Sequence, residues 1–155
     1  MERKPLDREL TDGVVTLRPP VTGDSEILIN GRDAEFHRSL GDGSPEPEPT
    51  AVVLNRDRQI TGWIDYDVGR EWLSAGEVNI GYNTFLQHRR LGLARRSIAL
   101  LIEFLAEDTA FTAATLLIDP ANVSSIAVAD SAGFREHGAV GGELFFKLYA
   151  PSPRQ

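Results

Sequence analysis

The chain has 155 residues, a formal net charge of −7 and no cysteine. A chain of this length can bury a core of its own without metal or disulfide staples. The absence of cysteine excludes disulfides, thiolate metal sites and a covalent cysteine nucleophile. The negative charge disfavours broad binding to a nucleic-acid backbone, so no nucleic-acid partner is expected. We therefore expect one globular domain, residues 1–155.

The sequence predicts neither a membrane segment nor a metal site. Its start, MERKPLDREL, lacks an apolar signal region, and no later stretch approaches 18 uninterrupted apolar residues. We therefore expect no membrane association and a cytoplasmic location. His37 and His137 have no His or Cys partner at ligand spacing, so no metal is expected. The sequence does not indicate an oligomeric state.

The first half of the chain predicts short strands and one interrupted helix. A β-branched run predicts a strand at residues 14–17, which ends at two prolines. Residues 24–40 predict a helix that Asp24 caps and that breaks near Gly31. A loop rich in Pro, Gly and acidic residues and then two strands joined by a turn are predicted at residues 41–50, 50–54 and 59–67.

The second half alternates strands and helices. The elements expected are a strand at 77–85, a helix at 92–107, a strand at 112–118, a helix at 122–132 and a strand pair around Phe134 and at 143–149. Asn122 is a candidate N-cap of the second of these helices, and Gly133 follows its end. This order predicts an α+β domain with a central mixed sheet of about six to seven strands flanked by helices.

The charges are unevenly distributed in this half. No acidic residue lies between Glu77 and Glu103, whereas the stretch contains His88 and four arginines, namely Arg89, Arg90, Arg95 and Arg96. Such a basic cluster is either a solvated helix face or an anion site.

The sequence HRRLGLARR joins the predicted strand 77–85 to the next helix. The first N–H groups of a helix lack partners and lie at the positive end of its dipole, so this junction suits a phosphate. Gly92 would let the backbone approach an anion closely, and Ala94 is too small to obstruct it. The neighbouring arginines would add charge-assisted hydrogen bonds, so the pattern predicts a pyrophosphate site. The G-x-G-x-x-G pattern of dinucleotide folds is absent.

Two motifs in this order resemble a known family, the GNAT superfamily of acetyl-coenzyme A dependent N-acetyltransferases. The first is [QR]-x-x-G-x-[GA], matched by Arg89, Gly92 and Ala94. The second is N-x-x-S on a helix that ends in G-F, matched by Asn122, Ser125, Gly133 and Phe134. The chain looks most like the branch that contains N-terminal acetyltransferases of ribosomal proteins and many small-molecule enzymes.

The resemblance implies a coenzyme site. The backbone of Asn83, Thr84 and Phe85 would pair with the pantetheine arm as an extra strand does. Asn122 would contact the pantetheine from the second helix, although it is also compatible with a plain helix cap, and Asp119 could cap instead. The segment that would hold the pyrophosphate is Arg89, Arg90, Leu91, Gly92, Leu93, Ala94 and Arg95.

The catalytic groups are less defined. Glu77 is the candidate general base, but it is also compatible with a solvated carboxylate at a strand end. A backbone N–H near Asn83 would polarise the acyl carbonyl. The family often has a tyrosine acid four residues before the glycine of G-F, and this chain has Ala129 there. Ser125 is the first candidate to replace that acid, with Ser131 or water as alternatives, and a thiolate leaving group does not strictly need one.

We therefore expect an enzyme that moves an acetyl group from acetyl-CoA to a primary amine by direct attack in a ternary complex. The alternatives are a non-catalytic acyl-CoA-binding module with the same fold and an unrelated phosphate-binding α+β protein. The acceptor would be a small molecule or a peptide N-terminus. A cationic amine is favoured by acidic residues in the segments expected to border it, although these also fit a soluble linker: Asp33, Glu35, Asp42, Glu46, Glu48, Asp65 and Asp67.

Overall fold

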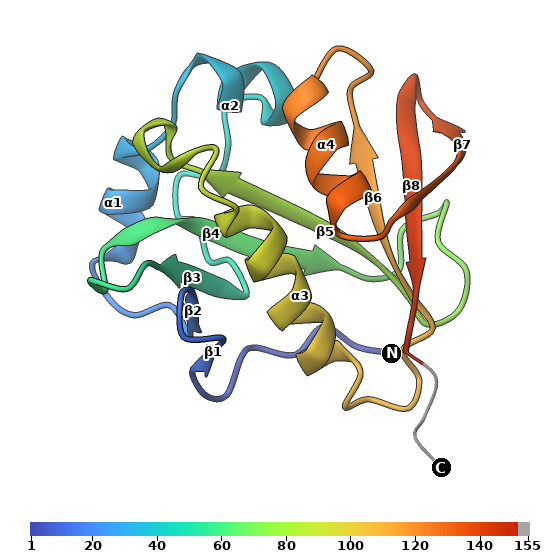
Figure 1. Ribbon diagram of the computed structural model, residues 1–155, viewed down its shortest axis with the longest axis horizontal. Helices are drawn as coiled ribbons and strands as arrows, with labels where there is room; N and C mark the ends of the chain where they lie inside the picture. The colour runs from blue at the N-terminus through green and yellow to red at the C-terminus, as the bar shows by residue number, and fades with distance from the viewer. Residues whose placement is uncertain (152–155) are drawn as a thin grey trace. The chain divides into compact units, whose positions relative to one another are not determined.

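The structure is a computed structural model that describes residues 1–151. Hydrogen-bonded neighbours give the strand order β1-β2-β3-β4-β5-β6-β8-β7 (Figure 1). The strands are β1 Leu10–Thr11, β2 Thr16–Arg18, β3 Ala51–Leu54, β4 Ile60–Asp67, β5 Glu77–Thr84, β6 Ala113–Ile118, β7 Arg135–Val140 and β8 Glu143–Tyr149. The helices are α1 Asp24–Asn30, α2 Ala34–Leu40, the 3-10 turn η1 Leu86–His88, α3 Leu93–Leu105 and α4 Val123–Ser131.

The predicted α+β class is confirmed. The sheet is mixed, because β5 and β6 pair in parallel while β2–β3, β3–β4, β6–β8 and β7–β8 are antiparallel. The predicted count of six to seven strands is too low, since the described residues form eight. The missed strand is β1, Leu10–Thr11, which is too short to show the alternation by which a strand is recognised in sequence.

Contacts within the chain group it into two compact units, and neither is a single continuous segment. The first unit comprises Met1–Arg3, Tyr66–Gly81 and the chain from Leu101 on, and the second comprises Lys4–Asp65 and Tyr82–Leu100. Strands β4 and β5 and helix α3 contribute residues to both units. The single domain 1–155 stays a prediction, and its last residues, 152–155, lie outside the described part of the chain.

The second unit contains the antiparallel strands β1 to β3, β4 as far as Asp65, and the helices α1 and α2. The turn between β3 and β4 is closed by the Arg58 N–H, which donates to the Asn55 carbonyl, and Arg58 adopts a positive φ of 60°. The buried side chains of its core form a cluster of Leu28, Val52, Leu54 and Phe85. Ile60 and Trp63 are partly buried and pack against this cluster.

The predicted interruption of the first helix at Gly31 is confirmed. Gly31 is the C-cap of α1, and α2 starts three residues later. A Cβ at Gly31 would overlap the ring of Phe85, so the glycine is needed for Phe85 to enter the core. The expected cap at Asp24 is wrong, because Gly23 holds the N-cap position. The Asp24 carboxylate instead forms a buried ion pair with Arg18 at 2.8 Å.

The first unit is built on β6, which pairs with the start of β5 on one side and with β8 on the other. In Figure 1, β8 lies between β6 and β7. The pairing of β5 with β6 ends at Asn79 and Thr115, whereas β6 goes on pairing with β8 as far as Ile118. The backbone of Ile80 and Gly81 has therefore left the parallel ladder.

The two long helices follow their sequence patterns. Helix α3 buries Ile98, Leu101 and Leu105 on one face, as their helical spacing predicts. Helix α4 is capped by Asn122, whose side chain accepts a hydrogen bond from the Ser125 N–H at 3.1 Å. Among residues 1–151, no helix has the length and apolar character needed to cross a membrane.

Candidate functional site

The start of helix α3 has the backbone of an anion site. Gly92 adopts a φ of 75°, in the region that glycine occupies without strain, and Arg90 before it has a φ of 64°. The Gly92 carbonyl accepts a hydrogen bond from the Arg96 N–H at 3.2 Å, so the helix begins at this glycine. The next N–H groups, from Leu93 on, belong to the first turn and have no partner within the helix. They are available to an anion.

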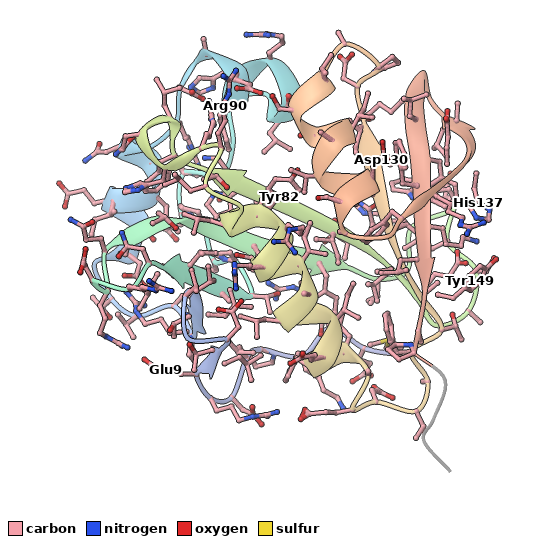
Figure 2. All side chains as sticks on the ribbon, viewed as in Figure 1. Glu9, Tyr82, Arg90, Asp130, His137 and Tyr149 are labelled. Carbon is pink, nitrogen blue, oxygen red and sulfur yellow. The ribbon has the colours of Figure 1, made fainter. Side chains whose placement is uncertain are left out.

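The four arginines of the basic cluster divide into two pairs. Arg96 forms an ion pair with Asp12 at 2.9 Å, and Arg89 forms ion pairs with two carboxylates. Arg90 and Arg95 are exposed, and the side chain of neither has an ion pair or hydrogen bond within residues 1–151. Arg90 is labelled in Figure 2 on the coil before α3. The cations that can meet an added anion here are therefore Arg90 and Arg95, with Gly92 between them.

Arg89 is held by the residues around it. Its Nη1 donates to Asp33 Oδ2 and to Glu35 Oε2, both at 2.8 Å, and its Nε donates to the Thr84 carbonyl at 2.8 Å. The carboxylates belong to the N-cap and the first turn of α2, more than fifty residues away in sequence. These bonds therefore compete with the predicted binding of a pyrophosphate by the Arg89 side chain.

At the end of strand β5, Asn83 is buried, whereas its neighbours Tyr82 and Thr84 are partly exposed. Asn83 is 7% exposed, and its Nδ2 has no hydrogen-bond partner in the described chain. The Phe85 N–H donates to the Thr61 carbonyl at 2.8 Å. Two backbone groups expected to meet the pantetheine arm, the Phe85 N–H and the Thr84 carbonyl, are thus bonded within the protein. The remaining pairing of Asn83, Thr84 and Phe85 with pantetheine stays a prediction.

Close approach of two backbones shapes this strand end. A Cβ added to Gly62 on β4 would overlap the carbonyl oxygen of Asn83. Any residue other than glycine would force β4 and β5 apart where the Phe85 N–H bonds to Thr61. The glycine therefore fixes how the end of β5 is presented.

Glu77 lies in the first unit and is part of a buried ion pair. Its Oε2 lies 2.6 Å from Lys147 Nζ on β8, and its Oε1 accepts a hydrogen bond from the Ser74 N–H at 3.0 Å. Burial raises the pKa of the Glu77 carboxyl, but the bonds from Lys147 and Ser74 outweigh it, so the pKa lies below its usual range. A carboxylate held in this way is a weak base. Its catalytic role stays a prediction.

The remaining predicted residues lie on α4. Asn122 caps the helix, which engages its side-chain oxygen, and Ser125 supplies the N–H that bonds to it. Their predicted roles toward pantetheine and the leaving thiolate stay predictions. Ala129, at the position of the expected tyrosine, is fully buried, so no side chain there reaches solvent. Within residues 1–151, no group of three His, Asp or Glu side chains could hold a metal ion.

The sequence profile described as the acetyltransferase (GNAT) domain matches residues 33–135, which is more than half of the chain. The chain belongs to the GNAT family of acetyltransferases. The matched segment contains β5, the coil with Gly92, α3 and α4. In this family acetyl-CoA is the acyl donor.

Solved structures of GNAT enzymes share the fold. The aminoglycoside acetyltransferase AAC(6')-Ib in complex with coenzyme A superposes with a TM-score of 0.75 at 18% identity, covering 87% of this chain and 94% of that one. RimJ from Mycobacterium smegmatis in complex with CoA-disulfide gives 0.69 at 20% identity, covering 92% and 85%. A chimera of the spermidine N-acetyltransferase SpeG from Vibrio cholerae with hSSAT gives 0.70 at 13% identity, covering 88% and 95%. No curated protein matches the sequence significantly.

Two features of this GNAT chain were missed by sequence reasoning. The carboxylates that hold Arg89, and Lys147, which holds Glu77, are all more than fifty residues from their partners. No spacing rule links residues so far apart. The acid-free stretch did identify the arginines, but it gave no information on which of them are paired.

Proposed function

We propose that this GNAT chain transfers an acetyl group from acetyl-CoA to a primary amine by direct attack, and that both units together form one acyltransferase domain, residues 1–155. The observation that carries the proposal is the start of α3, where Gly92, free helix N–H groups and two unpaired arginines come together. Pyrophosphate carries negative charge that such a helix start stabilises. The family match supports acetyl-CoA as the donor.

The proposed reaction uses few side chains of the protein. The amine nitrogen attacks the thioester carbonyl, the carbon–sulfur bond breaks, and coenzyme A leaves as the thiolate. The proton lost by the amine goes to a base, for which Glu77 or a water is proposed, and the thiolate takes a proton from Ser125 or solvent. Because the Glu77 pKa is lowered, positioning of the two substrates is expected to contribute more to the rate than this base does.

We propose a cationic amine as the acceptor. Among the acidic residues expected to attract it, Asp33 and Glu35 are paired with Arg89, and Asp65 accepts hydrogen bonds from Thr50. Asp42 and Glu46 are exposed, so they can still attract a cation from solution. The names of two structural neighbours, an aminoglycoside acetyltransferase and a spermidine N-acetyltransferase, are consistent with cationic amines.

Coenzyme binding tests the proposal directly. Gly92→Asp adds a side chain and a negative charge where the pyrophosphate would lie, so isothermal titration calorimetry should show coenzyme A binding weakened at least about tenfold. Gly69→Asp is the matched control, because Gly69 has a nearly equal φ of 73° and nothing within 4 Å of its added Cβ. Equal affinity of the two folded variants would remove the start of α3 as the coenzyme site.

A non-catalytic acyl-CoA-binding module is the second candidate. Two observations favour it: the buried Ala129 at the position of the usual acid, and the ion pair that holds Glu77. Release of free thiol from acetyl-CoA, measured with a panel of primary amines, separates the two functions. Amine-dependent thiol release supports the enzyme, whereas binding of acetyl-CoA without release for any amine supports the module.

A further inference from the structure

Arg89 is the first residue of the motif that predicts the coenzyme site, yet its guanidinium bonds to the protein. Four hydrogen bonds use its Nε and both terminal nitrogens: to the Thr84 carbonyl at 2.8 Å, to Asp33 Oδ2 at 2.8 Å, to Glu35 Oε2 at 2.8 Å and to Asp33 Oδ1 at 3.2 Å. The side chain is 22% exposed. Most of its five donors are thus engaged.

The charge around Arg89 disfavours a phosphate ligand. One guanidinium faces two carboxylates, so the group as a whole is negative. A pyrophosphate placed against Arg89 would meet the carboxylates of Asp33 and Glu35 at close range. Arg90 and Arg95 carry no such acidic partners in the described chain.

The same bonds join two elements. The Thr84 carbonyl is the last of strand β5, whereas Asp33 is the N-cap of α2, with its Oδ1 accepting the Phe36 N–H at 3.0 Å. The Arg89 bond, followed by that of Phe36, lowers the pKa of Asp33 against the effect of burial, so the carboxylate is ionised at neutral pH. Arg89 therefore connects the end of β5 to the start of α2 through one charged group.

We propose that Arg89 is a positioning residue: it fixes the end of β5 against helix α2 and does not bind the pyrophosphate. This inference rests on the proposed coenzyme site. It makes coenzyme binding depend on Asp33 and Glu35 of α2, a segment in which no coenzyme contact is otherwise proposed.

Removing one carboxylate from the Arg89 group distinguishes the two roles of Arg89, because it changes coenzyme A affinity in a different direction for a positioning residue than for a phosphate ligand. If Arg89 positions β5, then Asp33→Asn and Glu35→Gln each loosen it, and calorimetry should show coenzyme A affinity lowered about three- to tenfold. If Arg89 binds pyrophosphate, removing either acid leaves the affinity unchanged or increases it. Asp42→Asn is the matched control, since it removes the same charge from a nearby exposed residue that does not contact Arg89. Glu35→Gln leaves the Asp33 cap intact, so it remains informative if Asp33→Asn does not fold.

The affinity for pantetheine is a second measurement, and the loss of a phosphate contact would not change it. Pantetheine has the amide arm of the coenzyme but no phosphate, and its binding to Arg89→Ala can be followed by NMR titration. We expect Arg89→Ala to weaken pantetheine and coenzyme A by similar factors, whereas Arg95→Ala should weaken coenzyme A alone. Normal pantetheine affinity in Arg89→Ala would overturn the inference. Failure of the unmodified protein to bind coenzyme A would instead refute the proposed function.

Discussion

The buried pair of Glu77 and Lys147 gives the prediction that is most fully determined by the structure. Their side chains are 7% and 15% exposed, and the two charged atoms lie 2.6 Å apart. Glu77→Gln or Lys147→Met alone leaves the other charge buried without its partner. The double variant removes both charges and should lose much less stability than the two single changes together.

The magnitude follows from the burial. Loss of one member of a buried pair costs about 3 kcal/mol of unfolding free energy. For a chain of this size that corresponds to a fall of roughly 6 to 12 °C in Tm. Because the folded pKa of Glu77 is lowered, its contribution is fully present above its unfolded pKa of about 4.5 and is lost as the pH falls through the folded value.

Urea denaturation at pH 7, followed by circular dichroism, measures these differences. Asp67→Asn is the matched control, because it breaks an exposed pair with Arg70 and should cost less than about 1 kcal/mol. Single-variant losses no larger than the control's, or losses that simply add in the double variant, would show that the pair is not energetically coupled. If the double variant is stable but transfers acetyl slowly, with its pH–rate profile shifted toward alkali, the base role of Glu77 gains support.

Three further predictions concern β5 and the acceptor. Gly62→Ala should destabilise the protein by about 2 kcal/mol in urea denaturation, because its Cβ overlaps the Asn83 carbonyl. Gly81→Ala is the control and should cost much less, since nothing lies within 4 Å of its added Cβ. Equal losses of stability in the two variants would contradict the close approach of β4 and β5. Asn83→Leu should stabilise the ligand-free protein by about 1 kcal/mol, since it removes a buried amide nitrogen without a partner, and a lower Tm by calorimetry would contradict this. Raising salt from about 50 to 500 mM should raise the KM of a cationic amine more than that of a neutral amine, and a salt-independent KM would remove Asp42 and Glu46 from acceptor attraction.

The fold was largely predictable because its elements are encoded locally. Alternation and helical spacing placed β3 to β6, β8 and the helices within a few residues of their observed ends, whereas β7 was expected only around Phe134 and extends over Arg135–Val140. Gly31 was correctly predicted as a break, although its reason, the ring of Phe85, is not visible in the local sequence. The failures are β1, which has only two residues, and the cap at Asp24, whose carboxylate is used by Arg18.

The candidate site was predictable only at the level of residue types. The acid-free stretch and Gly92 indicated an anion site, and the backbone conformation of Gly92 agrees with that use. The bonds of Arg89 and Glu77 could not be predicted, because ion pairs between distant segments depend on the folded arrangement. The sequence therefore suggested more free charge near the start of α3 than the protein has.

The discontinuous make-up of the second unit has a consequence for synthesis of the protein. Its core joins Leu28, Val52 and Leu54 to Phe85, which is encoded after the intervening segment Tyr66–Gly81. A nascent chain that ends before Phe85 therefore exposes apolar side chains that have no complete core to enter. We expect ribosome-stalled fragments that end at residue 80 to be digested by protease and to bind chaperones, and fragments that extend beyond α3 to gain protection.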